Sequence, residues 1–221
     1  MDPGPRFLYL HGFASGPNST KGVKLSERFA ARGVTLQRLN LRVPSLERLS
    51  FQDMLNVVRA ALGDSRDRAV VFGSSLGGLT AARVAEEDAR VAALVLLAPA
   101  FRLAERWRQR LGEDGWRRWR ETGRLDVQDY AENRATRVHY DFVRELSTLD
   151  GKGDGWPDVR VPTLIIHGRS DDTVDIQLSR DFAAGKPWVN LVEVDDGHEL
   201  TASLERIDSE AQAFLRPFLG R

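Results

Sequence analysis

The segment VVFGSSLGGLTAARVAEE, residues 70–87, contains a strand, a tight turn and a helix in direct succession. Its first three residues form an apolar run typical of a buried strand, and the residues from 76 onwards have helical periodicity. Residues 73–77 between them have the form G-x-S-x-G, with Ser75 in the middle. Such a turn strains the backbone of its middle residue and exposes that side chain, as a nucleophile requires. The alternative interpretation is a tight turn with an incidental serine.

Short apolar runs alternate with amphipathic segments along most of the remaining sequence. We expect strands at residues 7–10, 34–41, 70–72, 91–97, 164–166 and 189–194. We expect helices near residues 21–32, 51–63, 76–88, 176–184 and 203–219. Strands and helices that alternate in this way predict a parallel sheet with helices on both faces. A length of 221 residues fits one α/β domain that spans residues 1–221.

Residues 101–157 interrupt this alternation with more than fifty residues that show no clear strand. The segment holds tryptophans and many arginines, and it leaves the expected sheet after the fourth strand. Because a structureless loop of that length is improbable inside a compact domain, we expect a helical insertion. Two interpretations stay open: extra packing at the edge of the sheet, or a lid over a site.

The composition excludes several classes of function. The chain has no cysteine, which excludes disulfides, thiolate catalysis and cysteine-built metal sites, and no metal or cofactor is expected. Its 32 basic and 32 acidic residues balance, so no overall charge favours nucleic acid or an anionic membrane. Residues 1–10 lack a signal-peptide pattern, and the longest apolar stretch is far below the ~20 residues that span a bilayer. We therefore expect a cytoplasmic protein.

A nucleophilic serine needs a general base, because an isolated hydroxyl is almost fully protonated at neutral pH. His198 follows the expected sixth strand, at the edge where open α/β sheets build their sites, and we choose it as the base. His11 and His167 each precede a glycine at a strand end, where a ring typically braces a loop. His139 lies in the insertion and is expected to pack or to face solvent.

The base needs an acid that orients its ring, and two adjacent aspartates follow the expected fifth strand. Asp171 and Asp172 point in different directions, so only one of them can face His198, and spacing alone does not choose between them. With either one, the chain order Ser…Asp…His differs from that of chymotrypsin and of subtilisin.

Acyl transfer also requires hydrogen-bond donors for the oxyanion. We expect one N–H from Leu76, directly after the nucleophile, and a second from Phe13 in the loop after the first strand. That loop is rich in Gly and Ser and contains Lys21, but it lacks the spacing of a phosphate-binding P-loop.

The motifs at residues 10–13, 73–78, 167–171 and 197–198 together resemble those of the α/β-hydrolase superfamily. Residues 11–22, HGFASGPNSTKG, resemble the opening of the small bacterial YqiA/YcfP-like esterases. In the superfamily pattern H-G-x-x-D-x-x-V the acid is the aspartate four residues after the histidine, which implies Asp171. The resemblance implies a three-layer α/β-hydrolase fold with six mostly parallel strands in the order 2-1-3-4-5-6. The two antiparallel strands that usually precede them have no counterpart here.

These features predict a serine hydrolase that cleaves small-molecule carboxylic esters of small to medium acyl groups through an acyl-enzyme. Its triad would be Ser75, Asp171 and His198. A thioesterase or an amidase would use the same groups, and a non-catalytic binding protein on a hydrolase scaffold is a third interpretation. The oligomeric state stays open. Candidate residues of the substrate pocket are Trp116, Trp119, Tyr140 and Val174.

Overall fold

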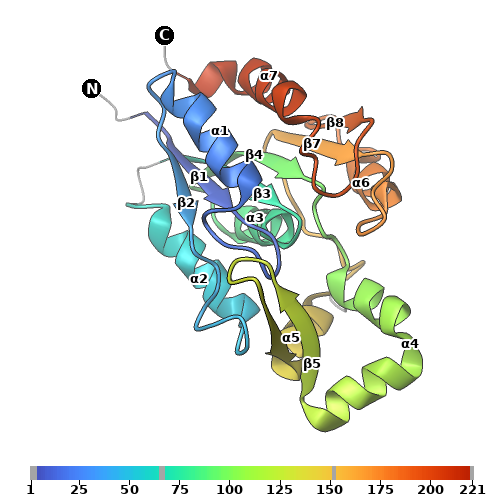
Figure 1. Ribbon diagram of the computed structural model, residues 1–221. Coiled ribbons are helices and arrows are strands. Elements are labelled where there is room, and N and C mark those ends of the chain that lie inside the picture. The colour runs from blue at the N-terminus through green and yellow to red at the C-terminus, as the bar shows by residue number, and fades with distance from the viewer. Residues whose placement is uncertain (1–3, 65–67, 151–152, 220–221) are drawn as a thin grey trace.

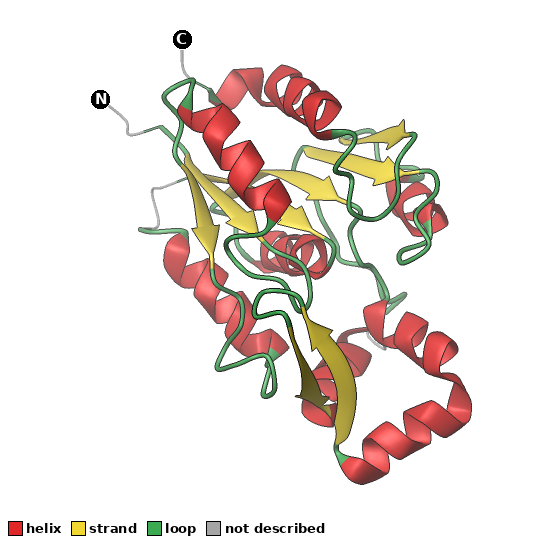
Figure 2. Cartoon of the chain, in the orientation of Figure 1, coloured by secondary structure: helices red, strands yellow, loops and turns green. Residues whose placement is uncertain are grey.

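Six parallel strands form the central sheet of the computed structural model, which describes residues 4–64, 68–150 and 153–219 (Figures 1 and 2). The strands of this sheet are β1 (Arg6–Leu10), β2 (Leu36–Leu39), β3 (Ala69–Ser74), β4 (Val91–Leu97), β7 (Thr163–Gly168) and β8 (Val189–Val194). They lie in the order β2-β1-β3-β4-β7-β8, with every neighbouring pair parallel. Counted within the sheet alone, this is the predicted order 2-1-3-4-5-6, and the fold prediction is confirmed.

Helices cover both faces of the sheet. The helices that pack on it are α1 (Thr20–Ala30), α2 (Phe51–Ala61), α3 (Leu76–Glu87), α6 (Ile176–Ala183) and α7 (Leu204–Leu215), the last continuing into the 3₁₀ turn η1 (Arg216–Phe218). Helices α1 and α7 lie together on one face, and α2, α3 and α6 lie on the other (Figure 1). Along β1, Tyr9 packs toward the first group and Leu8 and Leu10 toward the second, as the two-residue period of a strand requires.

The insertion between β4 and β7 is only partly helical. It consists of α4 (Leu103–Thr122), the strands β5 (Arg124–Asp129) and β6 (Arg134–His139), and α5 (Tyr140–Asp150). The two strands form an antiparallel hairpin, so the expectation of an insertion without strands is wrong. The more buried positions of each strand alternate with exposed ones, and no long apolar run marks either strand in the sequence.

Helix α4 consists of two helical segments that meet at an angle. Gly112 has φ 65° and ψ 172° within it, which breaks the regular helix there. Figure 1 shows the chain change direction in the middle of α4. Among the described helices, none is both long and apolar enough to cross a membrane.

The insertion is fixed to the sheet domain at the tip and the side of its hairpin. Arg42, in the loop after β2, makes two hydrogen bonds of 2.7 Å to Asp129, whose side chain is fully buried. The backbone N–H of Tyr130 donates to the carbonyl of Ala14 at 2.9 Å, and that of His139 donates to the carbonyl of Glu47 at 2.9 Å. The hairpin tip therefore lies against the loop that follows β1 (Figure 1).

Candidate active site

Ser75 occupies the turn between β3 and α3 in a strained backbone conformation. Its φ of 53° and ψ of −116° lie outside the regions that non-glycine residues normally adopt. Its N–H donates to the carbonyl of Leu97 at 2.9 Å, and its carbonyl accepts from the N–H of Gly78 at 2.9 Å. These bonds to β4 and α3 hold the turn in place.

Two glycines of the G-x-S-x-G motif permit close backbone contacts. A Cβ atom at Gly73 would lie 2.3 Å from the carbonyl oxygen of Gly77. A Cβ atom at Gly77 would lie 2.2 Å from the carbonyl oxygen of Leu10. Both distances are far below van der Waals contact, so a side chain at either position would force the backbone of the turn apart.

His198 connects Ser75 to an aspartate. Its Nε2 lies 3.0 Å from Ser75 Oγ, and its Nδ1 lies 2.8 Å from Asp171 Oδ2. An ionised carboxylate only accepts hydrogen bonds, so Nδ1 carries the proton and Nε2 is free to accept from the Ser75 hydroxyl. The three residues follow the carboxyl ends of β3, β7 and β8, which the parallel sheet brings to one edge.

The side chain of Asp171 is fully buried and accepts four hydrogen bonds. Oδ2 accepts from His198 and, at 3.1 Å, from Nε2 of His167, while Oδ1 accepts from the N–H groups of Thr173 and Val174 at 2.9 and 2.7 Å. Burial raises the pKa of Asp171, but these hydrogen bonds outweigh burial and hold that pKa well below its ordinary value. Asp172 is exposed, and within the described part of the chain its side chain accepts only from the hydroxyl of Thr173, at 3.2 Å. The geometry thus brings Asp171, and not Asp172, to His198.

The two expected oxyanion donors flank the nucleophile. Leu76 is the first residue of α3, and Gly12, directly before Phe13, lies so close to Ser75 that an added Cβ would be 3.4 Å from Ser75 Cβ. Within the described residues, the N–H groups of Phe13 and Leu76 donate to no other protein atom. Both are therefore available to an oxygen bound at Ser75.

Lys21 is a residue near this site that the sequence reasoning missed. Its side chain is buried, and its Nζ lies 3.3 Å from the carbonyl oxygen of His198 and 3.7 Å from the carboxylate of Glu199. Burial lowers the pKa of Lys21. The sequence contained a signal for this burial: Lys21, Leu25 and Phe29 are spaced four residues apart and so share one face of α1. All three side chains are buried.

The four candidate pocket residues lie in two different places. Val174 is buried and donates its N–H to Asp171, so it adjoins the triad. Trp116, Trp119 and Tyr140 contact one another within the insertion, and Trp119 is 1% exposed with its Nε1 bonded to the carbonyl of Val138. Trp119 is therefore a packing residue in this structure, and its expected contact with substrate is corrected.

Trp107 is the tryptophan of the insertion that reaches the loop after β1. Its ring lies 5.0 Å from that of Phe13 in an edge-to-face contact, and it also contacts the buried Trp119. Phe142 stacks on Phe13 from α5 at 6.0 Å. Two aromatic residues of the insertion are thus packed against the side chain of Phe13. The backbone N–H of this residue is one of the two expected oxyanion donors.

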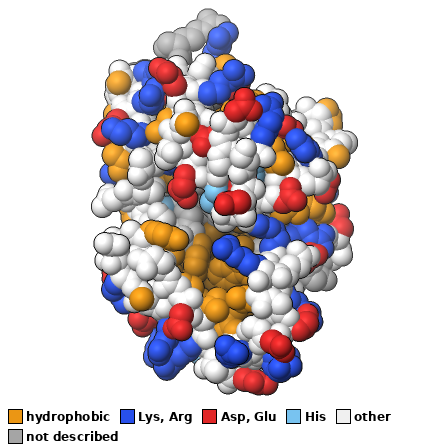
Figure 3. Space-filling model, turned by 45° about the vertical axis from the view of Figure 1, so that its right-hand side comes forward, with side chains coloured by type: hydrophobic (Ala, Val, Ile, Leu, Met, Phe, Trp, Pro, Cys, Tyr) orange, Lys and Arg blue, Asp and Glu red, His pale blue; other side chains and the backbone are white. Residues whose placement is uncertain are grey.

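A hollow lined by hydrophobic side chains opens on the face shown in Figure 3. It lies in the lower half of that view, at the height where Figure 1 places α4 and the hairpin. A His side chain is visible above the hollow, and Lys or Arg side chains border its upper edge (Figure 3). The surface therefore combines an apolar floor with basic side chains at its upper edge.

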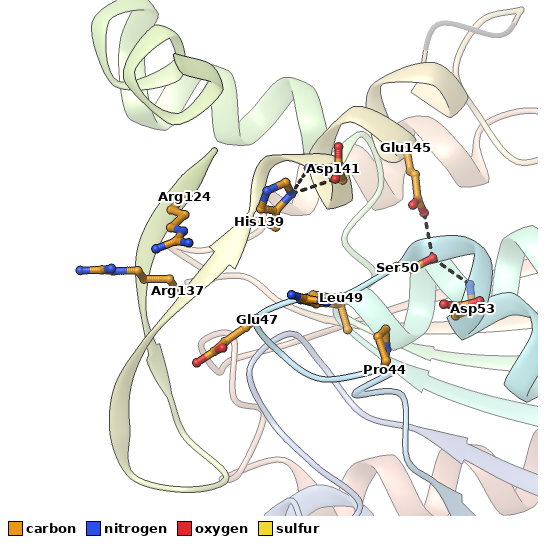
Figure 4. Close-up of a pocket in the computed structure, with 11 residues that line it drawn as sticks. Pro44, Glu47, Leu49, Ser50, Asp53, Arg124, Arg137, His139, Asp141 and Glu145 are labelled. Carbon is orange, nitrogen blue, oxygen red and sulfur yellow. Dashed lines mark hydrogen bonds and ion pairs between the residues drawn. The ribbon is translucent and has the colours of Figure 1, made fainter. Parts of the chain in front are cut away.

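A separate groove of about 700 Å³ lies between the hairpin, α5 and the loop that precedes α2 (Figure 4). None of the triad residues lines it. Two of its acidic side chains have partners: Glu145 accepts from the hydroxyl of Ser50, and Asp141 pairs with His139 at 2.9 Å. In the described ranges, no group of three or more His, Asp or Glu side chains is placed to hold a metal ion.

Solved structures similar to this chain share its fold. Est1E from Butyrivibrio proteoclasticus, with ferulic acid bound, has a TM-score of 0.82 and 22% identity over 100% of this chain and 92% of its own. Alpha/beta hydrolase domain-containing protein 10 from mouse has a TM-score of 0.78 and 19% identity over 98% and 92%. The esterase domain of a Rhodothermus marinus protein has a TM-score of 0.68 and 20% identity over 100% and 90%.

Sequence comparison identifies the family. No curated protein gives a significant sequence match. The model of the family described as "Uncharacterised protein family (UPF0227)" matches residues 6–215, which is nearly the whole chain. The protein therefore belongs to the UPF0227 family, and it shares the fold of the α/β hydrolases among these solved structures.

Proposed function

We propose that this protein is a serine hydrolase that cleaves carboxylic esters through an acyl-enzyme intermediate. The observation that carries the proposal is the chain of hydrogen bonds from Ser75 Oγ to His198 Nε2 and from His198 Nδ1 to Asp171, with the serine on a strained turn. A nucleophile, a base and an orienting acid in this arrangement are what acyl transfer requires.

In the proposed acylation step, Ser75 Oγ attacks the carbonyl carbon of the ester while His198 Nε2 takes the hydroxyl proton. The carbonyl oxygen of the ester becomes negatively charged in the tetrahedral intermediate and is stabilised by the N–H groups of Phe13 and Leu76. The imidazolium of His198 is stabilised by Asp171, whose lowered pKa keeps it ionised. His198 then gives its proton to the departing alcohol as the ester C–O bond breaks.

In the proposed deacylation step, a water molecule takes the place of the alcohol. His198 removes a proton from the water, the resulting hydroxide attacks the acyl carbonyl, and Ser75 leaves with the proton returned from His198. The same two N–H groups stabilise the second oxyanion. No metal or cofactor takes part in either step of the proposal.

We assign the insertion, residues 101–157, to the wall of an apolar acyl pocket. The contacts of Trp107 and Phe142 with Phe13 support this assignment, because they join the insertion to the loop beside Ser75. Such a pocket fits acyl chains of small to medium length. The bonds from Arg42 to Asp129 fix the hairpin, so any lid movement belongs to α4 rather than to the hairpin.

Hydrolysis of p-nitrophenyl esters with two to twelve acyl carbons tests the proposal. The wild type is expected to be most active on short or medium chains. Ser75→Ala and His198→Ala should each lose at least about 10⁴-fold in kcat, the scale seen when triad residues are removed. Circular dichroism of each variant should match that of the wild type, because both residues have small structural roles outside the site.

The same assay separates the competing functions. A wild type that binds esters but turns over none of them, with Ser75→Ala indistinguishable from it, would indicate a binding protein. A kcat/KM far higher on matched thioesters or amides than on oxygen esters would indicate a thioesterase or an amidase that uses the same triad.

A further inference from the structure

Arg106, on α4, is a partly buried arginine whose side chain has no partner among the described residues. Most arginines of the described insertion are exposed. The two that are partly buried are Arg102 and Arg106. Arg102 pairs with Glu105 at 2.6 Å, whereas the guanidinium of Arg106 has no hydrogen bond or ion pair to any described residue. Partial burial of an arginine without a counter-charge is unfavourable, and an anionic ligand at this position would offset that cost.

Arg106 lies on α4, the helix that contacts the loop beside Ser75 through Trp107. It directly precedes Trp107, whose ring contacts Phe13. Burial lowers the pKa of Arg106, and the charges of Asp171 and Asp175 act in the opposite direction. Helix α4 thus brings the cation within electrostatic range of the aspartate that orients His198. Figure 3 shows basic side chains at the edge of the apolar hollow below a His.

The nearby carboxylates already have their own hydrogen bonds. Asp171 accepts four, which is about the full capacity of a carboxylate. Asp175 is the exposed N-cap of α6 and accepts from the N–H of Gln177 at 2.9 Å. Neither is in ion-pair contact with Arg106. Among the described residues, the guanidinium therefore keeps its N–H donors free, within electrostatic range of the aspartate that orients His198.

We propose that Arg106 binds a carboxylate or similar anionic group of the substrate, so that the esters cleaved here carry a negative charge apart from the ester group. The inference rests on the proposed hydrolase function and narrows its substrate class. A guanidinium can make two parallel hydrogen bonds to a carboxylate, which orients the substrate as well as binding it. The charged group can belong to the acyl part or to the alcohol, and two substrate pairs distinguish these.

The first pair is p-nitrophenyl butyrate and mono-p-nitrophenyl glutarate, which differ by a carboxylate on the acyl part. The second pair is phenyl acetate and 4-acetoxybenzoate, which differ by a carboxylate on the leaving group. Arg106→Gln should lower kcat/KM on the charged member of one pair by about ten- to a hundredfold. Activity on both neutral esters should stay within about twofold, and Arg106→Lys should restore part of the loss.

Arg108→Gln is the matched control. Arg108 lies two residues further along α4 and is exposed in an ion pair with Glu113 at 2.8 Å. It should leave all four substrates unaffected. Equal losses on charged and neutral esters in Arg106→Gln, or the same selective loss in Arg108→Gln, would overturn the anion site and leave the esterase proposal intact.

Binding to the Ser75→Ala variant gives a readout that needs no turnover. By calorimetry this variant should bind the charged ester of the affected pair at least about tenfold more tightly than the neutral one. Adding Arg106→Gln should abolish that difference. A protein that hydrolyses no ester yet shows this binding pattern would refute the esterase and retain the anion site, whereas equal binding of charged and neutral esters would refute the anion site.

Discussion

At the scale of single residues, the structure decides what the spacing left open. Both Asp171 and Asp172 follow β7, and the sequence order fits either one. Burial separates them: Asp171 faces inward and accepts bonds from two histidines and two backbone N–H groups, while Asp172 faces solvent. The direction of a side chain at a loop position depends on the turn, which adjacent letters of a sequence do not encode.

Substitution of each aspartate tests this distinction. Asp171→Asn should reduce kcat by up to about 10⁴-fold, because the amide stabilises neither the correct tautomer of His198 nor its imidazolium. Asp172→Asn is the control and should stay within about twofold of the wild type. Steady-state kinetics on one p-nitrophenyl ester is sufficient, and the reverse ranking would show that Asp172 is the acid.

At the scale of elements, the sequence predicted the sheet and missed the hairpin. The inner strands β1, β3, β4 and β7 are nearly continuous apolar runs, because both of their faces are buried, and such runs are visible in a sequence. Strands β5 and β6 bury only one face, at Leu125 and Val127 and at Thr136 and Val138, among charged residues. Their register depends on packing against residues 42–50, which is a long-range contact.

The Arg42–Asp129 ion pair should govern the stability of the hairpin. Asp129→Asn removes the buried counter-charge of the mostly buried Arg42 guanidinium and leaves it only the exposed Glu132, which costs on the order of 3 kcal/mol. For a chain of this size the melting temperature should fall by about 10 °C. Esterase activity should fall as well, because the hairpin tip is bonded to Ala14, next to Phe13.

Asp126→Asn supplies the matched control for that variant. Asp126 lies on the same strand, is 87% exposed and pairs with Arg137 at the surface. Its loss should change the free energy of unfolding by less than about 0.5 kcal/mol. If thermal unfolding shows equal effects for the two variants, the hairpin is not held by the buried pair.

At the scale of the whole molecule, the sequence predicted the architecture and the edge of the sheet where the polar groups meet. It could do so because the carboxyl ends of parallel strands lie at one edge, so loops after different strands converge. The contact between Trp107 and Phe13 and the burial of Lys21 were not predicted. Both depend on how the insertion and α1 pack against the sheet, and local sequence patterns do not specify that packing.

Stability should depend on pH with a defined sign. Hydrogen bonds from Arg42 lower the pKa of Asp129 to about 2, and those from Arg180 lower the pKa of Glu193 to about 2. Their contributions are complete above their ordinary pKa values near 4 and are lost as the pH falls toward 2. Burial lowers the pKa of His11, so stability should begin to decline as the pH falls below about 6.5.

Urea unfolding followed by tryptophan fluorescence at pH 7.5, 5 and 3 measures this dependence. The free energy of unfolding should fall slightly from pH 7.5 to 5 and steeply from pH 5 to 3. In Asp129→Asn the steep part should be smaller, because one of the responsible carboxylates is gone. A protein that becomes more stable on acidification would contradict the assignment of these ion pairs.

The central claim is that Ser75 is an activated nucleophile, and a fluorophosphonate probe tests it most directly. Such a probe forms a covalent bond with a serine whose hydroxyl is activated by a neighbouring base. After reaction, intact-mass spectrometry should show a single adduct, and peptide mapping should locate it on Ser75. Labelling should vanish in Ser75→Ala and slow strongly in His198→Ala. An adduct on Ser74, or labelling that persists in Ser75→Ala, would contradict the account.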